Sequence, residues 1–253
     1  MKANNEDHYL AEDLATRAGL LLIEERKLCQ DCDPEILKQK GDKKSHNFLM
    51  EELASLRPKD GVLSEEGLAN PVHPDRSDTN RVWIVDPLDG TREFGEPRRD
   101  DWAVHVALAV DGLPVVGAVS IPALNSTFST CNDFLEPSSP SEDKKIRIVV
   151  SRSRPPIEAS RVAEKIDGTL IEMGSAGAKS MAVVRGLADV YIHSGGQYEW
   201  DNCAPAAVAF AAGLHVSRLD GSPLTYNNPD PWLPDLLICN PFLALPVLEI
   251  LNS

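Results

Sequence analysis

The sequence 83-WIVDPLDGTREF-94 places two carboxylates, Asp86 and Asp89, three residues apart directly after an apolar run. The apolar run predicts a buried strand, and we expect Pro87 to stop it because proline cannot donate a hydrogen bond to a sheet. Side chains at the end of such a strand lie at a sheet edge, where clefts form. The segment therefore indicates two oxygen ligands at the abrupt end of a buried strand.

The residues after these carboxylates are typical of an anion site. Gly90 permits a sharp turn, and Thr91 is expected to begin a helix whose free N–H groups favour a bound phosphate. Carboxylate oxygens with no His or Cys among them suit Mg²⁺. An ordinary Asp-Pro turn followed by a helix cap would show the same residues, so the choice between a turn and a metal site depends on the rest of the chain.

Further acidic residues follow the same pattern. Glu65 and Glu66 end a short apolar strand in "DGVLSEEG", and Asp201 in "QYEWDNCAP" stands at the entrance of an alanine-rich helix. Adjacent acids after buried residues are costly unless they are solvated or bind a metal. Asp201 alone would be interpreted as a helix N-cap. Together with the pair in 83–94, these acids predict a Mg²⁺ site built from several element ends.

Hydrophobic periodicity predicts an α/β chain of layered, α+β character. Helices are predicted at 8–28, 43–56, 155–166, 175–188 and 201–214. Strands are predicted at 62–63, 81–85, 102–110, 114–122, 146–151 and 189–193. The Pro-, Ser- and charge-rich segment 136–145 is a linker candidate. We therefore expect an N-terminal metal-binding lobe, 1–135, and a C-terminal lobe, 146–253, that form one catalytic unit with the chemistry between them.

Composition excludes some classes of partner. The chain has 253 residues, 42% of them hydrophobic, and a formal net charge of −14. Such a surface repels a nucleic acid polymer, but a bound metal can still attract a small phosphorylated ligand. No apolar run reaches the length of a membrane span, and the polar, acidic start is unlike a signal peptide. A cytoplasmic protein without a membrane partner is expected.

The five cysteines are scattered apart from Cys29 and Cys32, which form a single CxxC motif. Without a second pair or a nearby histidine, zinc is weakly supported. We interpret these two residues as ordinary thiols at a helix end, which fits a reducing compartment.

The combination of "WIVDPLDGTREF", "LSEE" upstream and "WD" downstream resembles the signature of the inositol monophosphatase superfamily of Mg²⁺-dependent, lithium-sensitive phosphatases. The resemblance covers nearly the whole chain. "DPLDGTREF", "VVSRSR" and "GSAGAKS" are similar to elements of its 3′(2′),5′-bisphosphate nucleotidase (CysQ-like) subgroup. The resemblance implies the alternating αβαβα-type sandwich of this sugar phosphatase fold.

The resemblance also implies the metal ligands. One Mg²⁺ would be held by Glu65, Asp86 and the Leu88 carbonyl, and a second by Asp86, Asp89 and Asp201. Two or three Mg²⁺ ions are expected per active site. Metal ions about 3.5–4 Å apart can activate a water and neutralise a leaving oxygen, so no nucleophilic side chain is required.

The catalytic set implied by the resemblance comprises Asp42, Glu65 and Thr91. The Thr91 hydroxyl, paired with Asp42, would orient the attacking water. The family shows a Thr-x-x-Asp segment at this point, and "QKGDKKS" lacks the threonine. Asp42 as a helix cap before residue 43 therefore stays open beside the catalytic interpretation.

Two groups of residues are implied as substrate contacts. The scissile phosphate would meet Leu88, Asp89, Gly90, Thr91 and Asp201, and the rest of the nucleotide would meet Arg154, Gly174, Ser175 and Lys179. The subgroup has an arginine where this chain has His193, and an Arg pair such as Arg152 and Arg154 can also be a solvated surface feature.

These features predict removal of the 3′-phosphate of 3′-phosphoadenosine 5′-phosphate, giving AMP, with 3′-phosphoadenosine 5′-phosphosulfate as an additional substrate. The alternatives are an inositol 1-phosphate or fructose 1,6-bisphosphate phosphatase of the same superfamily, and an inactive metal- or nucleotide-binding regulator. The resemblance further implies a homodimer and a role in sulfur assimilation.

Overall fold

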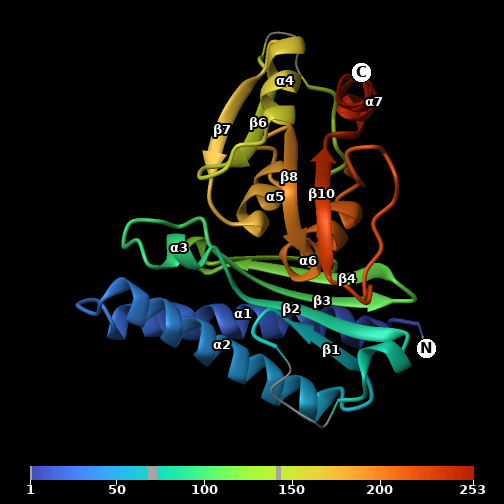
Figure 1. Ribbon diagram of the computed structural model, residues 1–253. Helices are drawn as coiled ribbons and strands as arrows, with labels where there is room; N and C mark the ends of the chain where they lie inside the picture. The colour runs from blue at the N-terminus through green and yellow to red at the C-terminus, as the bar shows by residue number, and fades with distance from the viewer. Residues whose placement is uncertain (1, 68–72, 141–143) are drawn as a thin grey trace.

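The computed structural model describes residues 2–67, 73–140 and 144–253. Its helices and sheets alternate in five layers, α–β–α–β–α (Figure 1). The helices are α1 (Asn5–Leu28), α2 (Pro34–Leu56), α3 (Thr91–Phe94), α4 (Ile157–Lys165), α5 (Ala176–Val184), α6 (Glu199–Ala211) and α7 (Pro241–Leu251). The layered α/β sandwich predicted from the sequence is confirmed.

The first sheet has the strand order β1-β2-β3-β4-β5. Only the β1–β2 pair is parallel, and the remaining pairs are antiparallel. Its strands are β1 (Gly61–Ser64), β2 (Arg81–Asp89), β3 (Ala103–Val110), β4 (Leu113–Ile121) and β5 (Ser126–Ser129). Asp111 and Gly112 join β3 to β4 in a two-residue hairpin turn with φ of 51° and 77°.

The second sheet has the order β7-β6-β8-β10-β9. Strand β6 is parallel to both of its neighbours, β7 and β8, and β10 is antiparallel to β8 and β9. Its strands are β6 (Arg147–Ser151), β7 (Thr169–Met173), β8 (Val190–Tyr198), β9 (His215–Ser217) and β10 (Trp232–Cys239). The sequence analysis located β6 and β8 but did not predict β7, β9, β10 or α7.

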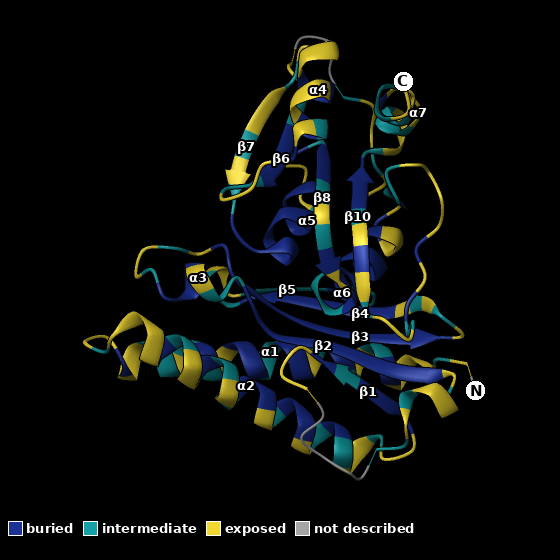
Figure 2. Cartoon of the chain, in the orientation of Figure 1, coloured by how far each residue is buried: buried dark blue, intermediate teal, exposed yellow. Residues whose placement is uncertain are grey.

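Three apolar cores hold the layers together. Helices α1 and α2 pack on one face of the first sheet, α5 and α6 fill the space between the sheets, and α4 and α7 cover the outer face of the second sheet. Strands β2 and β3 of the first sheet are buried throughout, while the outward faces of α1 and α2 are exposed (Figure 2). No helix of the described residues is long and apolar enough to cross a membrane.

Strand β2 does not stop at Pro87 as predicted but continues to Asp89. Asp86 pairs with His105 and Asp89 with Ala103, so β2 carries one extra residue in this stretch and forms a bulge. A proline is tolerated at a bulge because the extra residue leaves the ladder of hydrogen bonds.

Helix α2 begins at Pro34, nine residues before the predicted start at 43. Asp33 caps it, since its side chain accepts a hydrogen bond from the Glu35 N–H at 2.8 Å, and proline is favoured in the first turn. Gly41 remains inside the helix because its missing side chain makes room for Phe94 of α3. Asp42 is therefore an interior helix residue, and its interpretation as a cap is wrong.

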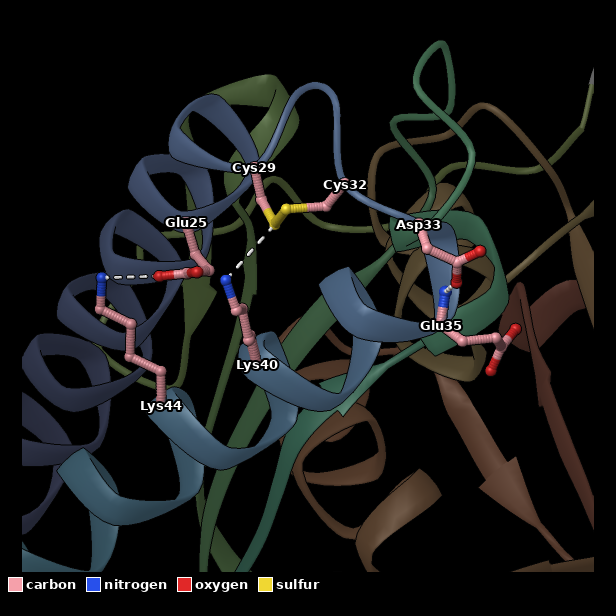
Figure 3. Close-up of a disulfide and its surroundings, with 7 residues drawn as sticks. All are labelled: Glu25, Cys29, Cys32, Asp33, Glu35, Lys40 and Lys44. Atoms are coloured by element: carbon pink, nitrogen blue, oxygen red, sulfur yellow. Dashed lines mark hydrogen bonds and ion pairs between the residues drawn. A yellow bond between two sulfur atoms is a disulfide. The ribbon is translucent and has the colours of Figure 1, made fainter.

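The predicted linker, 136–145, precedes the second sheet, but 141–143 lie outside the described residues. Cys29 and Cys32 are joined by a disulfide at the turn between α1 and α2 (Figure 3), so their interpretation as two ordinary thiols is wrong. The turn brings their Cα atoms within 5.0 Å, which lies in the range a disulfide spans.

Candidate active site

Three carboxylates meet where the first sheet contacts α6. Asp86 and Asp89 of β2 and Asp201 of α6 each offer an oxygen, and these oxygens all lie within 4.8 Å of one another. Residues three apart on a regular strand point to opposite faces, but the extra residue in the β2 bulge reverses the second side chain. The bulge at Pro87 is therefore the reason why both acids of one strand reach Asp201.

Asp201 is the third residue of α6 rather than its N-cap. One of its oxygens accepts a hydrogen bond from the Tyr198 N–H at 2.6 Å, which closes a capping box at the start of the helix. The interpretation as an N-cap was three residues out of register, because Tyr198 is the N-cap. The helix start still directs the side chain toward the two acids of β2.

The remaining predicted acids lie at the edge of this cluster. Burial raises the pKa of Glu65 to about 7, and Asp201 adds to the shift. Burial also raises the pKa of Asp42 to about 7, with a contribution from Glu66. The structure thus brings Asp42, from the middle of α2, close to the acidic pair that follows β1.

Burial and mutual repulsion disfavour the ionised forms of most acids in the cluster. Burial raises the pKa of Asp86 well above its ordinary value, and the neighbouring Glu65 raises it further. Burial, followed by the charge of Asp89, raises the pKa of Asp201 to about 6. Like-charged oxygens in a low dielectric favour protonation or a divalent cation, and an all-oxygen donor set fits Mg²⁺.

Asp89 differs from the other acids because one of its oxygens is fully occupied. Oδ2 accepts hydrogen bonds from the Ser175 hydroxyl at 2.5 Å and the Gly177 N–H at 2.7 Å, and His105 Nε2 lies 3.1 Å away. Burial opposes ionisation here, but His105 and then Lys179 hold the pKa of this carboxyl well below its usual range. Asp89 is therefore an anion with Oδ1 left for a metal.

His105 is a site residue that the sequence analysis missed. It is fully buried on β3, and its Nδ1 donates to the Trp200 carbonyl at 3.0 Å. A Cβ on Gly177 would lie 2.1 Å from its Nε2, so only glycine fits at that place. A polar histidine inside the apolar alternation "WAVHVALAV" was the available signal, because a buried polar group needs partners.

The turn before α5 connects Asp89 to the second half of the chain. Ser175 has φ of 39°, an uncommon conformation for a residue with a side chain. Lys179 is buried, and its Nζ donates to the carbonyls of Gly174 at 2.8 Å and Ser175 at 2.6 Å. Lys179 thus fixes the backbone of the turn whose serine donates to Asp89.

Gly90 makes the predicted sharp turn with φ of 84°, and Thr91 begins α3 as expected. A side chain on Gly90 would meet Ser175, so the glycine allows the two turns to approach. The Thr91 hydroxyl donates to the Leu88 carbonyl at 3.1 Å, and among the described residues it has no hydrogen bond to Asp42. The predicted pairing of these two residues is therefore absent from the structure.

Helix α2 is attached to the same region by two side chains. The Ser45 hydroxyl donates to the Pro87 carbonyl at 2.7 Å, and His46 Nδ1 lies 3.1 Å from the Ser64 hydroxyl. Both residues are one helical turn beyond Asp42. The bulge of β2 and the end of β1 therefore set the position of α2, and with it the position of Asp42.

A hollow of about 210 Å³ lies beside these turns. It is lined by Gly90, Thr91, Arg92, Glu93, Ser151, Arg152, Ser153, Met173, Gly174, Ser175 and Lys179. It therefore brings together five of the predicted substrate contacts from both halves of the chain. The structure places Arg154 outside this lining, as an exposed residue that follows it. Arg152 faces the hollow, but its guanidinium donates to Glu93 at 2.7 Å and Glu96 at 2.8 Å.

Comparison with known proteins places this fold and this acidic cluster in one class. The model of the inositol monophosphatase family matches residues 4–240, and the chain belongs to that family.

Two relatives and one solved structure are especially similar. The 3′-phosphoadenosine 5′-phosphate phosphatase of Mycobacterium tuberculosis is 46% identical over 239 residues, covering 91% of this chain and 87% of that protein. The 3′(2′),5′-bisphosphate nucleotidase CysQ of Escherichia coli is 32% identical and covers 74% of this chain and 78% of its own length. The crystal structure of CysQ from Bacteroides thetaiotaomicron superimposes with a TM-score of 0.76 at 28% identity, covering 93% of this chain and 97% of that one.

Proposed function

We propose that this protein is a Mg²⁺-dependent phosphomonoesterase that removes the 3′-phosphate of 3′-phosphoadenosine 5′-phosphate and releases AMP. The observation that carries the proposal is the convergence of Asp86, Asp89 and Asp201, whose oxygens lie within 4.8 Å of one another beside a small polar hollow. The names of the relatives that are 44–46% identical over most of the chain support the choice of substrate.

Two Mg²⁺ sites are proposed, with a third ion entering with substrate. Glu65, Asp86 and the Leu88 carbonyl would hold one ion, and Asp86, Asp89 and Asp201 the other. When bound, Mg²⁺ supplies positive charge that stabilises the developing charge on the phosphoryl and leaving oxygens. Because the chain belongs to this family, we also expect inhibition by Li⁺.

The protein's own residues would orient the water and accept its proton. Asp42 has a pKa of about 7, raised by burial, which suits a general base near neutral pH. Water attacks the phosphorus and passes a proton to Asp42, while the bond to O3′ breaks and the leaving oxygen takes up a proton from solvent. Thr91 would turn its hydroxyl from the Leu88 carbonyl toward this water, and Glu65 would complete the catalytic set.

Selection of a nucleotide is proposed to depend on groups around the hollow. Gly174 and Ser175 would contact the sugar and phosphate through the turn, and Lys179 has a third N–H that is free of the two carbonyls it already binds. Arg154 is exposed next to the hollow, and it would meet the second phosphate.

The test is phosphate release from 3′-phosphoadenosine 5′-phosphate, 3′-phosphoadenosine 5′-phosphosulfate, inositol 1-phosphate and fructose 1,6-bisphosphate, each with Mg²⁺ and with excess EDTA. We expect the nucleotide to give the highest kcat/KM, AMP as the product, and no turnover with EDTA. A higher kcat/KM for inositol 1-phosphate would make this chain an inositol phosphatase. Turnover in excess EDTA would show that catalysis does not require a metal. Binding of the nucleotide without turnover would indicate an inactive regulator. A cytoplasmic location, a homodimer and the division into lobes at 136–145 remain predictions.

A further inference from the structure

The disulfide Cys29–Cys32 lies outside the candidate active site and forms a different kind of chemical group. Cys29 caps the end of α1, and Cys32 precedes Asp33, the N-cap of α2 (Figure 3). The bond therefore closes the turn between two long helices. A disulfide at such a turn restricts how far the first turn of α2 can open.

The two sulfurs are in unequal surroundings. Cys29 is only 3% exposed, whereas Cys32 is partly accessible. Lys40, two turns into α2, places its Nζ 3.8 Å from the sulfur of Cys29 (Figure 3). A nearby ammonium stabilises a thiolate, and a better leaving thiolate makes a disulfide easier to exchange. Attack at Cys32 would thus expel the sulfur that has a cation beside it.

A hollow of about 590 Å³ gives access to this bond. Both cysteines line it together with Arg26 and Lys27 of α1 and with Gly95 and Pro97, which follow α3. The space is larger than the one beside the carboxylate cluster. An extended segment of another protein that carries a thiol can therefore reach the sulfurs without unfolding of the helices.

The far wall of this hollow connects to the candidate active site. Lys38 of α2 packs closely on Gly95: a Cβ added to Gly95 would lie 2.6 Å from Lys38 Cε. The Gly95 N–H in turn donates to the Thr91 carbonyl at 3.2 Å. The same helix carries Asp42 one turn further. The first two turns of α2 therefore connect Cys32 to Asp42 along the helix and to Thr91 through Lys38 and Gly95. Asp42 and Thr91 are the two residues proposed to orient the water.

We infer that Cys29 and Cys32 form a reversible thiol–disulfide exchange site for a protein dithiol, and that the oxidised form is the more active one. A thiolate of the dithiol attacks the Cys32 sulfur, the Cys29–Cys32 bond breaks, and Cys29 leaves with the electron pair beside Lys40. The second thiol then attacks the mixed disulfide and releases Cys32. The dithiol is oxidised to its disulfide, and the two thiolates of this chain take up its two protons.

The position of α2 indicates why the oxidised form should be the more active one. With the disulfide closed, α2 is helical from Pro34 and holds Asp42 near the acidic cluster. Reduction removes the covalent link at its first turn, so α2 is expected to fray from Pro34 toward Lys40. The part of this inference that concerns activity rests on the proposed function, whereas the exchange chemistry does not.

The first test counts thiols in the folded protein. The purified chain is equilibrated in mixtures of reduced and oxidised dithiothreitol, quenched with an alkylating agent and weighed by mass spectrometry. We expect Cys29 and Cys32 to gain or lose alkylation together. Two alkylated cysteines without any reductant, or a bond that opens only in denaturant, would refute the exchange site. Cys131→Ser serves as the control, because Cys131 is a partly exposed free thiol elsewhere in the chain.

The second test uses two lysines of the same helix. Lys40→Met should slow reduction by dithiothreitol about threefold, because the leaving thiolate loses its cation. Lys44→Met should leave the rate unchanged, since Lys44 pairs with Glu25 (Figure 3) and with Glu24 instead. Equal rates in the two variants would show that Lys40 does not assist exchange.

The third test links the bond to α2. Reduction, and the double variant Cys29→Ser with Cys32→Ser, should speed amide hydrogen exchange over 34–40 and lower kcat/KM about fivefold. The double variant should no longer respond to dithiothreitol. Unchanged hydrogen exchange and equal activity of both forms would overturn the coupling, and a chain without phosphatase activity in either form would instead refute the proposed function.

Discussion

His105 Nε2 lies 3.1 Å from Asp89 Oδ2, an ion-pair distance, beside the two groups that donate hydrogen bonds to that oxygen. Because its Nδ1 donates to the Trp200 carbonyl, the imidazole must carry both protons to be a cation beside Asp89. Burial opposes that charge, but the carboxylate of Asp89 raises the pKa of His105 above its ordinary value. The histidine therefore fixes which oxygen of Asp89 remains for the metal.

Two substitutions of this histidine separate its hydrogen bond to Trp200 from its contact with Asp89. The amide of His105→Asn can reach the Trp200 carbonyl but not Asp89, whereas the longer amide of His105→Gln can reach Asp89. Losing a partner that orients a ligand weakens metal binding about 10–100-fold. We therefore expect a weaker apparent Mg²⁺ affinity in His105→Asn than in His105→Gln, measured by calorimetry and by Mg²⁺ titration of activity. Equal affinities would mean that the contact with Asp89 does not orient the ligand.

Asp89→Asn should fold normally and lose nearly all turnover. The two hydrogen-bond donors and the imidazole around Oδ2 require an acceptor, so the amide must turn its oxygen toward them and place its NH₂ where Oδ1 faces the metal. Loss of this electrostatic stabilisation should cost at least about 3 kcal/mol of activation free energy. Circular dichroism and kcat are the measurements, and Asp13→Asn on the exposed side of α1 is the control. A variant with half the normal activity would show that Asp89 is only a turn residue and not a metal ligand.

Lys179→Met should raise KM for 3′-phosphoadenosine 5′-phosphate about tenfold and leave KM for inositol 1-phosphate nearly unchanged. Methionine keeps most of the buried volume but removes the ammonium. A contact with the part of the nucleotide that does not react affects binding rather than kcat. A similar loss of kcat with both substrates would show instead that Lys179 acts only through the Gly174 and Ser175 carbonyls it binds.

Stability of the metal-free protein should fall as the pH rises from about 5 to about 7.5 relative to the Mg²⁺ form. Burial is the main cause that raises the pKa of Asp42 and Glu65 to about 7 and of Asp201 to about 6. The folded state then binds more protons than the unfolded chain in this window, so a rising pH favours unfolding. Mg²⁺ should remove the repulsion between these acids.

The measurement is the melting temperature with EDTA and with Mg²⁺ at both pH values. Histidines that titrate in the same window contribute to both curves, so the difference between them reports on the carboxylates. A stabilisation by Mg²⁺ that is equal at both pH values would contradict this account.

Local patterns in the sequence were sufficient for the elements that carry the acids. The apolar run before Asp86, the glycine turn at Gly90 and the start of α3 follow from nearest-neighbour chemistry, and the structure has each of them. The end of β2 was wrong because a proline ends a regular strand but not one that bulges. Such a bulge depends on the partner strand β3, which a local pattern does not contain.

Long-range contacts explain the other misses. The start of α2 was predicted at 43, whereas the helix begins at Pro34 and includes Gly41, where Phe94 fills the space that the glycine leaves. The polar His105 in an apolar alternation was a local signal, but the pattern could not assign it a role because its partners Asp89 and Trp200 come from β2 and α6. The disulfide required the turn that brings Cys29 and Cys32 together.

The middle layer has a consequence for synthesis on the ribosome. Once β5 has emerged, the first sheet can cover one face with α1 and α2, but its other face is covered by α5 and α6, which come from much later in the chain. Until α6 is complete, a nascent chain exposes that apolar face and keeps Asp86 and Asp89 apart from Asp201. The acidic cluster therefore cannot assemble before α6 has been synthesised, and a chain released earlier exposes apolar surface that makes it prone to aggregate.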